Sequence, residues 1–141
     1  MLISTKGRYA LTIMEELAQF EKGCYMPLPM IAEKQGISEK YLESIISMLV
    51  KGELVETLRG KKGGYRLKRQ PDSYSIGEIL RVAEGSLAPV SCLEGEMTCP
   101  HADGCSSLPV WQELERIINE YLDSVTLKNL IEQGGSVRRD R

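Results

Sequence analysis

Hydrophobic residues recur every three or four positions in several short stretches of the chain, a spacing that predicts helices with one buried face. The first stretch spans residues 5–20. The next two, 28–35 and 38–51, are separated by Gly36, a residue that readily adopts the left-handed conformation found at helix ends. A fourth, short stretch spans residues 75–84. The N-terminal part of the chain is therefore predicted to be mainly helical.

The two stretches on either side of Gly36 have the spacing of a helix-turn-helix. Gly36 would supply the turn, and the small side chain of Ala32 would let the helices cross closely. Four apolar residues would fill the wedge between the helices: Ile31, Ile37, Leu42 and Ile45. An ordinary pair of antiparallel core helices would show a similar pattern, so this spacing alone leaves both interpretations open.

Two short stretches of alternating polarity follow, at residues 54–58 and 65–67, and they predict half-buried strands. The residues between them include three glycines and the cations Arg59, Lys61 and Lys62. A phosphate-binding loop of a nucleotide-binding protein would end in Gly-Lys-Ser or Gly-Lys-Thr and lead into a helix, which this one does not. A helix-turn-helix followed by a basic hairpin is a winged helix. We therefore expect the chain to bind double-stranded DNA.

On this interpretation the helix at 38–51 enters the major groove with its N-terminal half. Glu43 is unusual beside a polyanion: it either accepts a hydrogen bond from a cytosine amino group or pairs at the surface with Lys40 or Ser47. The wing cations Arg59, Lys61 and Lys62 are expected to contact the DNA backbone or the minor groove. The candidate contacts on the helix are Ser38, Glu39, Lys40, Tyr41, Glu43 and Ser44, with Ser47 on the neighbouring turn.

Charge is distributed unevenly along the 141 residues, which are 42% hydrophobic and 27% charged and carry a formal net charge of -2. Residues 59–69 contain six cations and no acid, in keeping with a surface that contacts phosphates. No apolar run approaches the roughly 20 residues that span a bilayer. Four cysteines suit a reducing compartment, so we expect a cytoplasmic protein with no membrane partner.

Three of the four cysteines and the only histidine fall between residues 92 and 105, in a segment rich in glycine and polar residues. Such a segment has little apolar content to order it, and a metal centre is the natural candidate. Cys92, Cys99 and Cys105, spaced C-x6-C-x5-C, would supply three thiolates. Together with His101 they could hold zinc, or they could hold an iron–sulfur cluster that has one non-cysteine ligand. Free thiols or a disulfide are the remaining alternative.

Residues 108–133 are predicted to form one long helix with a continuous apolar stripe. This stripe is too long for the small winged unit to cover, so we expect the helix to pack against its copy in a homodimer. The predicted fold is mainly α with a small β-hairpin. It comprises a DNA-binding region (1–70), a short helix with a cysteine-rich segment (71–107), a dimerisation helix (108–133) and a flexible tail (134–141).

Residues 3–10, 31–43 and 55–65 resemble the corresponding motifs of the bacterial IscR/NsrR/CymR transcriptional regulators, and the likeness extends through 79–85 to 124–127. The resemblance implies a dimeric winged-helix repressor or activator. In cluster-binding members the cysteine segment holds a 2Fe-2S, sometimes a 4Fe-4S, cluster that alters DNA affinity or the choice of site. With one histidine and no nucleophile–base arrangement, the chain is not expected to be an enzyme.

The resemblance implies two alternative functions. IscR-type members place a ligand histidine three residues after the third cysteine, where this chain has Leu108, so His101 becomes the candidate for the fourth ligand. NsrR-type members can use an acidic residue near the N-terminus as the fourth ligand. This chain has Arg8 at that place, so this ligand is not expected here. CymR-type members regulate cysteine metabolism, and they can carry a redox-sensitive cysteine where this chain has Cys24. We expect the chain to sense iron–sulfur status through a cluster. Alternatively, it would act without a cluster, through a partner enzyme or through the redox state of Cys24, and its cysteine segment would be empty or would bind zinc.

Overall fold

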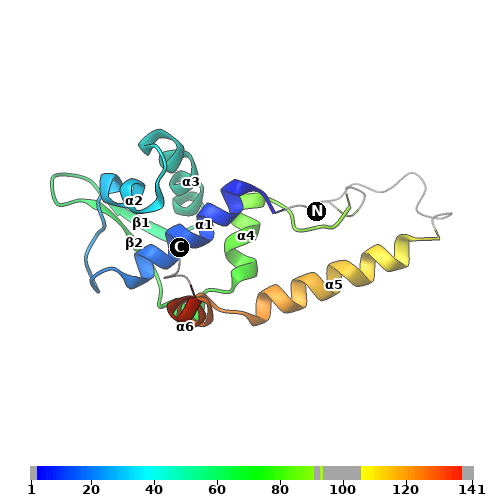
Figure 1. The fold of residues 1–141 in the computed structure, drawn as a ribbon. Coiled ribbons are helices and arrows are strands. Elements are labelled where there is room, and N and C mark those ends of the chain that lie inside the picture. Colours follow the sequence, from blue (N-terminus) through cyan, green and yellow to red (C-terminus); the bar gives the residue numbers. More distant parts are fainter. Residues whose placement is uncertain (1–2, 91–92, 94–105, 138–141) are drawn as a thin grey trace.

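The computed structural model describes residues 3–90, 93 and 106–137 (Figure 1). It is mainly helical with one two-stranded antiparallel sheet, which confirms the predicted fold class. The elements are α1 (Thr5–Gln19), α2 (Leu28–Gln35), α3 (Glu39–Lys51), β1 (Val55–Leu58), β2 (Gly64–Leu67), the 3₁₀ helix η1 (Pro71–Ser73), α4 (Ile76–Glu84), α5 (Leu108–Ser124) and α6 (Leu127–Val137).

Three helices of the winged unit begin at serine caps. The hydroxyl of Ser4 accepts a hydrogen bond from the backbone N–H of Gly7, and Ser38 and Ser75 cap α3 and α4 in the same way. Each cap satisfies a backbone N–H group that the first helical turn leaves without a partner. At the end of α2, Gly36 has a φ of 70°, the left-handed conformation predicted from the sequence.

The helix-turn-helix encloses a hydrophobic core. Ile31 and Leu42 are fully buried between α2 and α3, Ala32 and Ile45 are buried beside them, and Ile37 packs against the same cluster. The prediction of a wedge of apolar side chains at this crossing is confirmed. This core fixes the orientation of α3, so its opposite face is presented to solvent.

Strands β1 and β2 form the hairpin of the wing. Val55 pairs with Leu67 at its base and Leu58 with Gly64 at its tip. The hairpin is also joined to the loop between α1 and α2, since Met26 and Tyr65 exchange two backbone hydrogen bonds of 2.8 and 2.9 Å. A side chain at Gly64 would collide with the Met26 carbonyl, so glycine is needed at this close approach.

The predicted single helix over residues 108–133 is wrong, because the chain forms two helices that meet at Val125 and Thr126. Thr126 Oγ1 accepts a hydrogen bond from Asn129 N, and Asn129 Oδ1 accepts one from Thr126 N, both at 3.0 Å. This reciprocal pair caps a new helix. Leu127 is fully buried in the core of the winged unit, with its N–H bonded to the carbonyl of Tyr74. Burial of Leu127 and the new cap together separate α6 from α5.

Helix α5 extends away from the winged unit, and α6 returns to lie beside α1 (Figure 1). Within α5, all of which the structure describes, no residue is buried. Helix α6 continues to Val137, so the first residues of the expected tail are helical, and residues 138–141 lie outside the described part. The structure thus consists of a compact winged unit and one projecting helix.

Candidate nucleic-acid interface and metal ligands

Helix α3 presents a polar face to solvent at its N-terminal half. Leu42, Ile46 and Leu49 lie on the other face and are buried in the core. The predicted contact residues that are exposed at or on this helix are Ser38, Glu39, Lys40, Glu43, Ser44 and Ser47. A helix held by one apolar face and exposed along the other has the form of a recognition helix that enters a major groove.

The side chains of this face differ in how freely they can reach DNA. Ser44 Oγ donates to the carbonyl of Tyr41 at 2.7 Å, and Ser38 Oγ is used by the helix cap. The Tyr41 ring is half-buried and packs edge-on against Tyr9, with centroids 5.9 Å apart. The Tyr41 ring therefore packs against the protein. The sequence pattern does not indicate this role.

Glu43 is exposed, and within the described residues it forms no ion pair with Lys40 and no hydrogen bond with Ser47. Ser47 Oγ instead donates to the carbonyl of Ser44 at 3.2 Å. The surface pairing considered for Glu43 is thus not formed. Its carboxylate remains available to accept a hydrogen bond from a partner.

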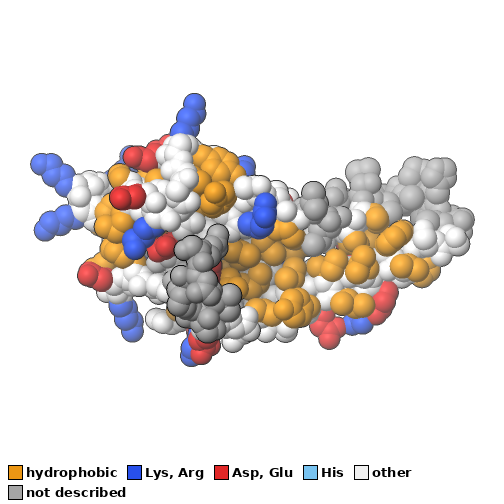
Figure 2. All heavy atoms as spheres, viewed as in Figure 1, with side chains coloured by type: hydrophobic (Ala, Val, Ile, Leu, Met, Phe, Trp, Pro, Cys, Tyr) orange, Lys and Arg blue, Asp and Glu red, His pale blue; other side chains and the backbone are white. Residues whose placement is uncertain are grey.

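The basic cluster of residues 59–69 divides into two groups. Arg59, Lys61 and Lys62 are exposed in the loop between β1 and β2, and they form no ion pair in the described part of the chain. Figure 2 shows Lys and Arg side chains projecting at the end of the molecule where the hairpin lies. This loop can place three positive charges beside a polyanion such as the DNA backbone.

The second group, Arg66 and Arg69, serves the fold, and the sixth cation, Lys68, has only a long contact of 3.8 Å with Glu53. Arg66 Nε donates to Glu56 Oε1 at 2.6 Å, and Arg66 Nη1 donates to the Gly23 carbonyl at 2.9 Å. Arg69 Nη2 donates to Glu78 Oε1 at 2.6 Å. Hydrogen bonding to these carboxylates raises the pKa of both guanidinium groups. Arg66 and Arg69 therefore stabilise the base of the wing. Unlike the cations at the tip, their guanidinium groups already have partners within the protein.

The predicted metal ligands Cys92, Cys99, Cys105 and His101 lie outside the described residues. Elsewhere, the described ranges contain no group of three or more His, Cys, Asp or Glu residues that could hold a metal ion. Three thiols and one imidazole between positions 92 and 105 form a donor set that suits a thiolate-bound metal centre. The fourth cysteine, Cys24, is an exposed free thiol whose Sγ lies 3.6 Å from Glu21 Oε2.

The apolar stripe of α5 is exposed to solvent. The exposed fraction is 58% for Val110, 37% for Leu114, 49% for Ile117 and 64% for Tyr121. These residues recur at helical spacing, and Figure 2 shows hydrophobic side chains following the projecting helix. A contiguous apolar face of this kind is typical of a protein–protein contact.

None of the helices in the described ranges is both long enough and apolar enough to cross a membrane.

Comparison with known proteins places this architecture in a family. A family model described as "Rrf2: Iron-dependent Transcriptional regulator" matches residues 3–133. The HTH-type transcriptional regulator CymR of Bacillus subtilis (strain 168) is 42% identical over 130 residues, 92% of this chain and 89% of the relative. The HTH-type transcriptional regulator IscR of Sodalis glossinidius is 37% identical over 131 residues, 93% of this chain and 79% of the relative.

The fold agrees with that assignment. The solved structure of CymR, the global cysteine regulator of B. subtilis, superposes on this chain with a TM-score of 0.75 at 41% identity, covering 94% of this chain and 98% of that one. The predicted resemblance to the IscR and CymR regulators is confirmed. The chain is a regulator and not an enzyme, and it belongs to the Rrf2 family of winged-helix transcriptional regulators.

Proposed function

We propose that the chain is a homodimeric, cytoplasmic regulator that binds operator DNA and senses iron–sulfur status through a cluster ligated by Cys92, Cys99 and Cys105. The observation that carries the proposal is the donor set itself: three thiols spaced C-x6-C-x5-C in a chain that matches an iron-dependent family. A 2Fe-2S cluster fits three thiolates and one further ligand, for which His101 is the candidate.

DNA binding is assigned to α3 and to the tip of the wing. The exposed side chains of Lys40 and Glu43 would face base edges, since no ion pair holds them to the described surface. Lys61 and Lys62 would contact phosphates and so position the protein on the duplex. Sequence choice would rest on α3, and most of the salt-dependent affinity on the wing.

The exposed stripe on α5 supports a dimer. Covering Val110, Ile117 and Tyr121 with the same stripe of a second copy would bury apolar surface that one chain leaves in water. Two copies related by a two-fold axis would present two recognition helices to a near-palindromic site, with half-sites about 34 Å apart. A helix that projects from the winged unit is suited to crossing over the partner chain.

The helices that precede and follow the cysteine segment, α4 and α5, each make contacts with the rest of the described chain. On one side, Glu84 at the end of α4 accepts hydrogen bonds from Ser4 N and Ser4 Oγ, both at 2.8 Å, at the start of α1. On the other side, α5 is held to α4 by Arg81 and Asp123. A change in the segment between α4 and α5 would therefore be transmitted to both α1 and the projecting helix.

When bound, the cluster would supply a redox-sensitive and labile centre. Regulation requires that occupancy favour one arrangement of α5 relative to the winged unit over another, because a ligand bound equally well in both would change nothing. The two arrangements would differ in the separation of the two α3 helices in the dimer. That separation would determine which operators the dimer fits.

Anaerobic purification tests the cluster directly. We expect a coloured protein that contains iron and acid-labile sulfide in equal amounts, both lost in Cys92→Ala, Cys99→Ala and Cys105→Ala. The matched control is Cys24→Ala, which removes the cysteine outside the segment and should keep both. A colourless protein with zinc, or iron content unchanged in all three variants, would refute the proposal.

A CymR-like regulator of cysteine metabolism that uses no cluster is the second candidate. It is favoured by the similarity to CymR and by the exposed thiol of Cys24. It would act through a partner enzyme or through oxidation of Cys24, with the cysteine segment empty or zinc-bound. In this case Cys24→Ser would abolish the response of DNA binding to oxidant, whereas Cys92→Ala would leave it intact.

A further inference from the structure

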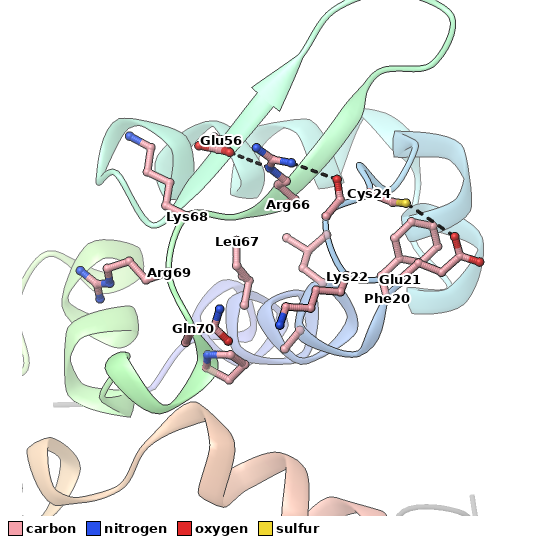
Figure 3. A pocket seen from close by; sticks show the side chains of 14 residues that line it. Phe20, Glu21, Lys22, Cys24, Glu56, Arg66, Leu67, Lys68, Arg69 and Gln70 are labelled. Atoms are coloured by element: carbon pink, nitrogen blue, oxygen red, sulfur yellow. Dashed lines mark hydrogen bonds and ion pairs between the residues drawn. The ribbon is translucent and has the colours of Figure 1, made fainter.

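A pocket lies at the base of the wing (Figure 3), and its lining includes no residue of α3 or of the hairpin tip. Its volume is about 480 Å³, which falls within the range that holds small organic ligands. The walls come from the end of α1, the loop that follows it, strand β2 and the linker to η1. Segments distant in the sequence therefore meet around one hollow.

The pocket has more positive than negative charge. Four cations line it, Lys22, Arg66, Lys68 and Arg69, against the two acids Glu21 and Glu56. Arg66 is paired with Glu56 inside the pocket, and Arg69 is paired with Glu78 outside it. With both arginines paired, Lys22 and Lys68 remain against Glu21, which leaves one net positive charge and makes the site suited to a monoanion.

In the described part of the chain, neither lysine is held by a short ion pair, and the amine of Lys22 points toward the middle of the pocket, whereas that of Lys68 points outward (Figure 3). Lys22 forms no ion pair within the described ranges, and Lys68 has only a long contact of 3.8 Å with the exposed carboxylate of Glu53. Arg66, by contrast, is fixed by the Gly23 carbonyl and lies 4.4 Å from the centroid of the Tyr25 ring. The pocket therefore combines a guanidinium held by two hydrogen bonds with two ammonium groups that no short ion pair holds among the described residues.

Apolar side chains form the rest of the lining, among them Leu17, Phe20, Leu67 and Pro71. An inorganic anion would leave these surfaces in contact with water. A ligand with a hydrocarbon or aromatic body would cover them and gain the associated hydrophobic free energy. The lining thus matches a small molecule that carries an acidic group at one end and an apolar body at the other.

We propose that this pocket binds a small organic anion, a carboxylate with an apolar body, between α1 and the base of the wing. The carboxylate would lie among Lys22, Lys68 and Arg66, and the body would rest on Phe20 and Leu67. Nothing in this proposal depends on the cluster or on DNA, so it stands or fails separately from the function proposed above.

The test is a titration of the full-length, isotope-labelled protein, followed through its backbone amide resonances at constant ionic strength. Phenylacetate is the probe, phenylacetamide is its neutral counterpart, and inorganic phosphate is an anion without an apolar body. We expect phenylacetate to shift the amides of Lys22, Leu67 and Gln70 saturably, with a dissociation constant on the order of 1 mM. Phenylacetamide and phosphate should bind more weakly at these amides.

Neutralising variants complete the test. Lys22→Gln and Lys68→Gln should each weaken phenylacetate binding by about three- to tenfold. Lys128→Gln, which changes an exposed lysine on α6, is the matched control and should bind like the parent protein. Unchanged resonances far from the pocket will show that the variants are folded. Absence of saturable shifts, equal binding of phenylacetamide, or equal weakening by Lys128→Gln would each overturn the proposal.

Discussion

The guanidinium of Arg81 in α4 binds both carboxylate oxygens of Asp123 in α5, at 2.8 and 3.1 Å, and also donates to Asn119 Oδ1 at 2.9 Å. These hydrogen bonds join residues far apart in the sequence, and they hold the base of the projecting helix to the winged unit. Gly77 makes the close approach feasible, because a side chain there would collide with Asp123.

A double-mutant cycle with Arg81→Met and Asp123→Asn should give a coupling free energy of about 1 kcal/mol, the upper end for an exposed bidentate pair. Denaturant unfolding at fixed protein concentration measures it. The matched control is Arg116→Met with Glu113→Gln, a fully exposed pair within α5 that should couple more weakly because water screens both charges. A coupling for Arg81 and Asp123 no larger than that of the control would contradict the role of this pair as a clamp.

Tyr74 provides a second test of the fold. Its hydroxyl donates to the Leu54 carbonyl at 2.7 Å and accepts from the backbone N–H groups of Lys68 and Arg69 at 3.0 and 2.9 Å. Tyr74→Phe leaves these three backbone groups without that partner and should lower the free energy of unfolding by roughly 2 kcal/mol. Lys128→Gln, at an exposed side chain of α6, should change it little.

The same residue predicts a dependence on pH. Burial raises the pKa of Tyr74 above its ordinary value of 10.0. Its contribution to stability is therefore fully present below the unfolded-state pKa and is lost as the pH rises through the folded-state pKa. Unfolding measured from pH 8 upward should show this loss above about pH 10 in the parent protein and a smaller loss in Tyr74→Phe. Identical pH profiles would show that Tyr74 does not contribute.

The tip of the wing should account for much of the electrostatic affinity for DNA. Replacing Lys61 and Lys62 with alanine should weaken binding to all duplex sequences. It should also reduce the slope of log K against log salt concentration by roughly 0.9 for each phosphate that the wing no longer neutralises. Fluorescence anisotropy at several salt concentrations measures the slope. Lys128→Ala is the control on α6. An unchanged slope in the wing variant would mean that this loop does not touch phosphate.

The exposed stripe of α5 predicts a dimer that one charge should break. Ile117→Glu places a carboxylate in the centre of the stripe and should convert the dimer to a monomer, as measured by sedimentation equilibrium. Gln112→Glu introduces the same charge on the opposite side of the same helix and should leave the dimer intact. A parent protein that is monomeric, or an Ile117→Glu variant that remains dimeric, would contradict this assignment.

Local signals explain which parts of the fold could be predicted. The turn at Gly36 lies where the spacing indicates, and the caps at Ser38 and Ser75 are the first residues of the stretches predicted as helices over 38–51 and 75–84. The prediction of one helix overlooked a change of phase at the break between α5 and α6: the apolar stripe recurs at three- and four-residue steps as far as Val125, but Leu127 follows after only two residues. The capping pair Thr126 and Asn129 is the local signal for it.

The parts that could not be predicted depend on contacts between distant residues. Nothing in the spacing indicates that Arg81 meets Asp123, or that the Tyr41 ring packs on Tyr9 instead of standing free for DNA. Likewise, the spacing does not show which cations of the basic cluster are paired with acids and which are free to contact DNA. Arg66 is paired with Glu56 across the hairpin, whereas Lys61 at the tip has no acid opposite it.

The most direct test of the central claim compares operator affinity with and without the cluster. A duplex selected from random sequences by the anaerobically purified protein is titrated with the same protein before and after cluster removal, at one salt concentration. The account predicts that the dissociation constant changes by at least about fivefold, the lower end of typical allosteric coupling. Equal dissociation constants for the two forms would contradict it.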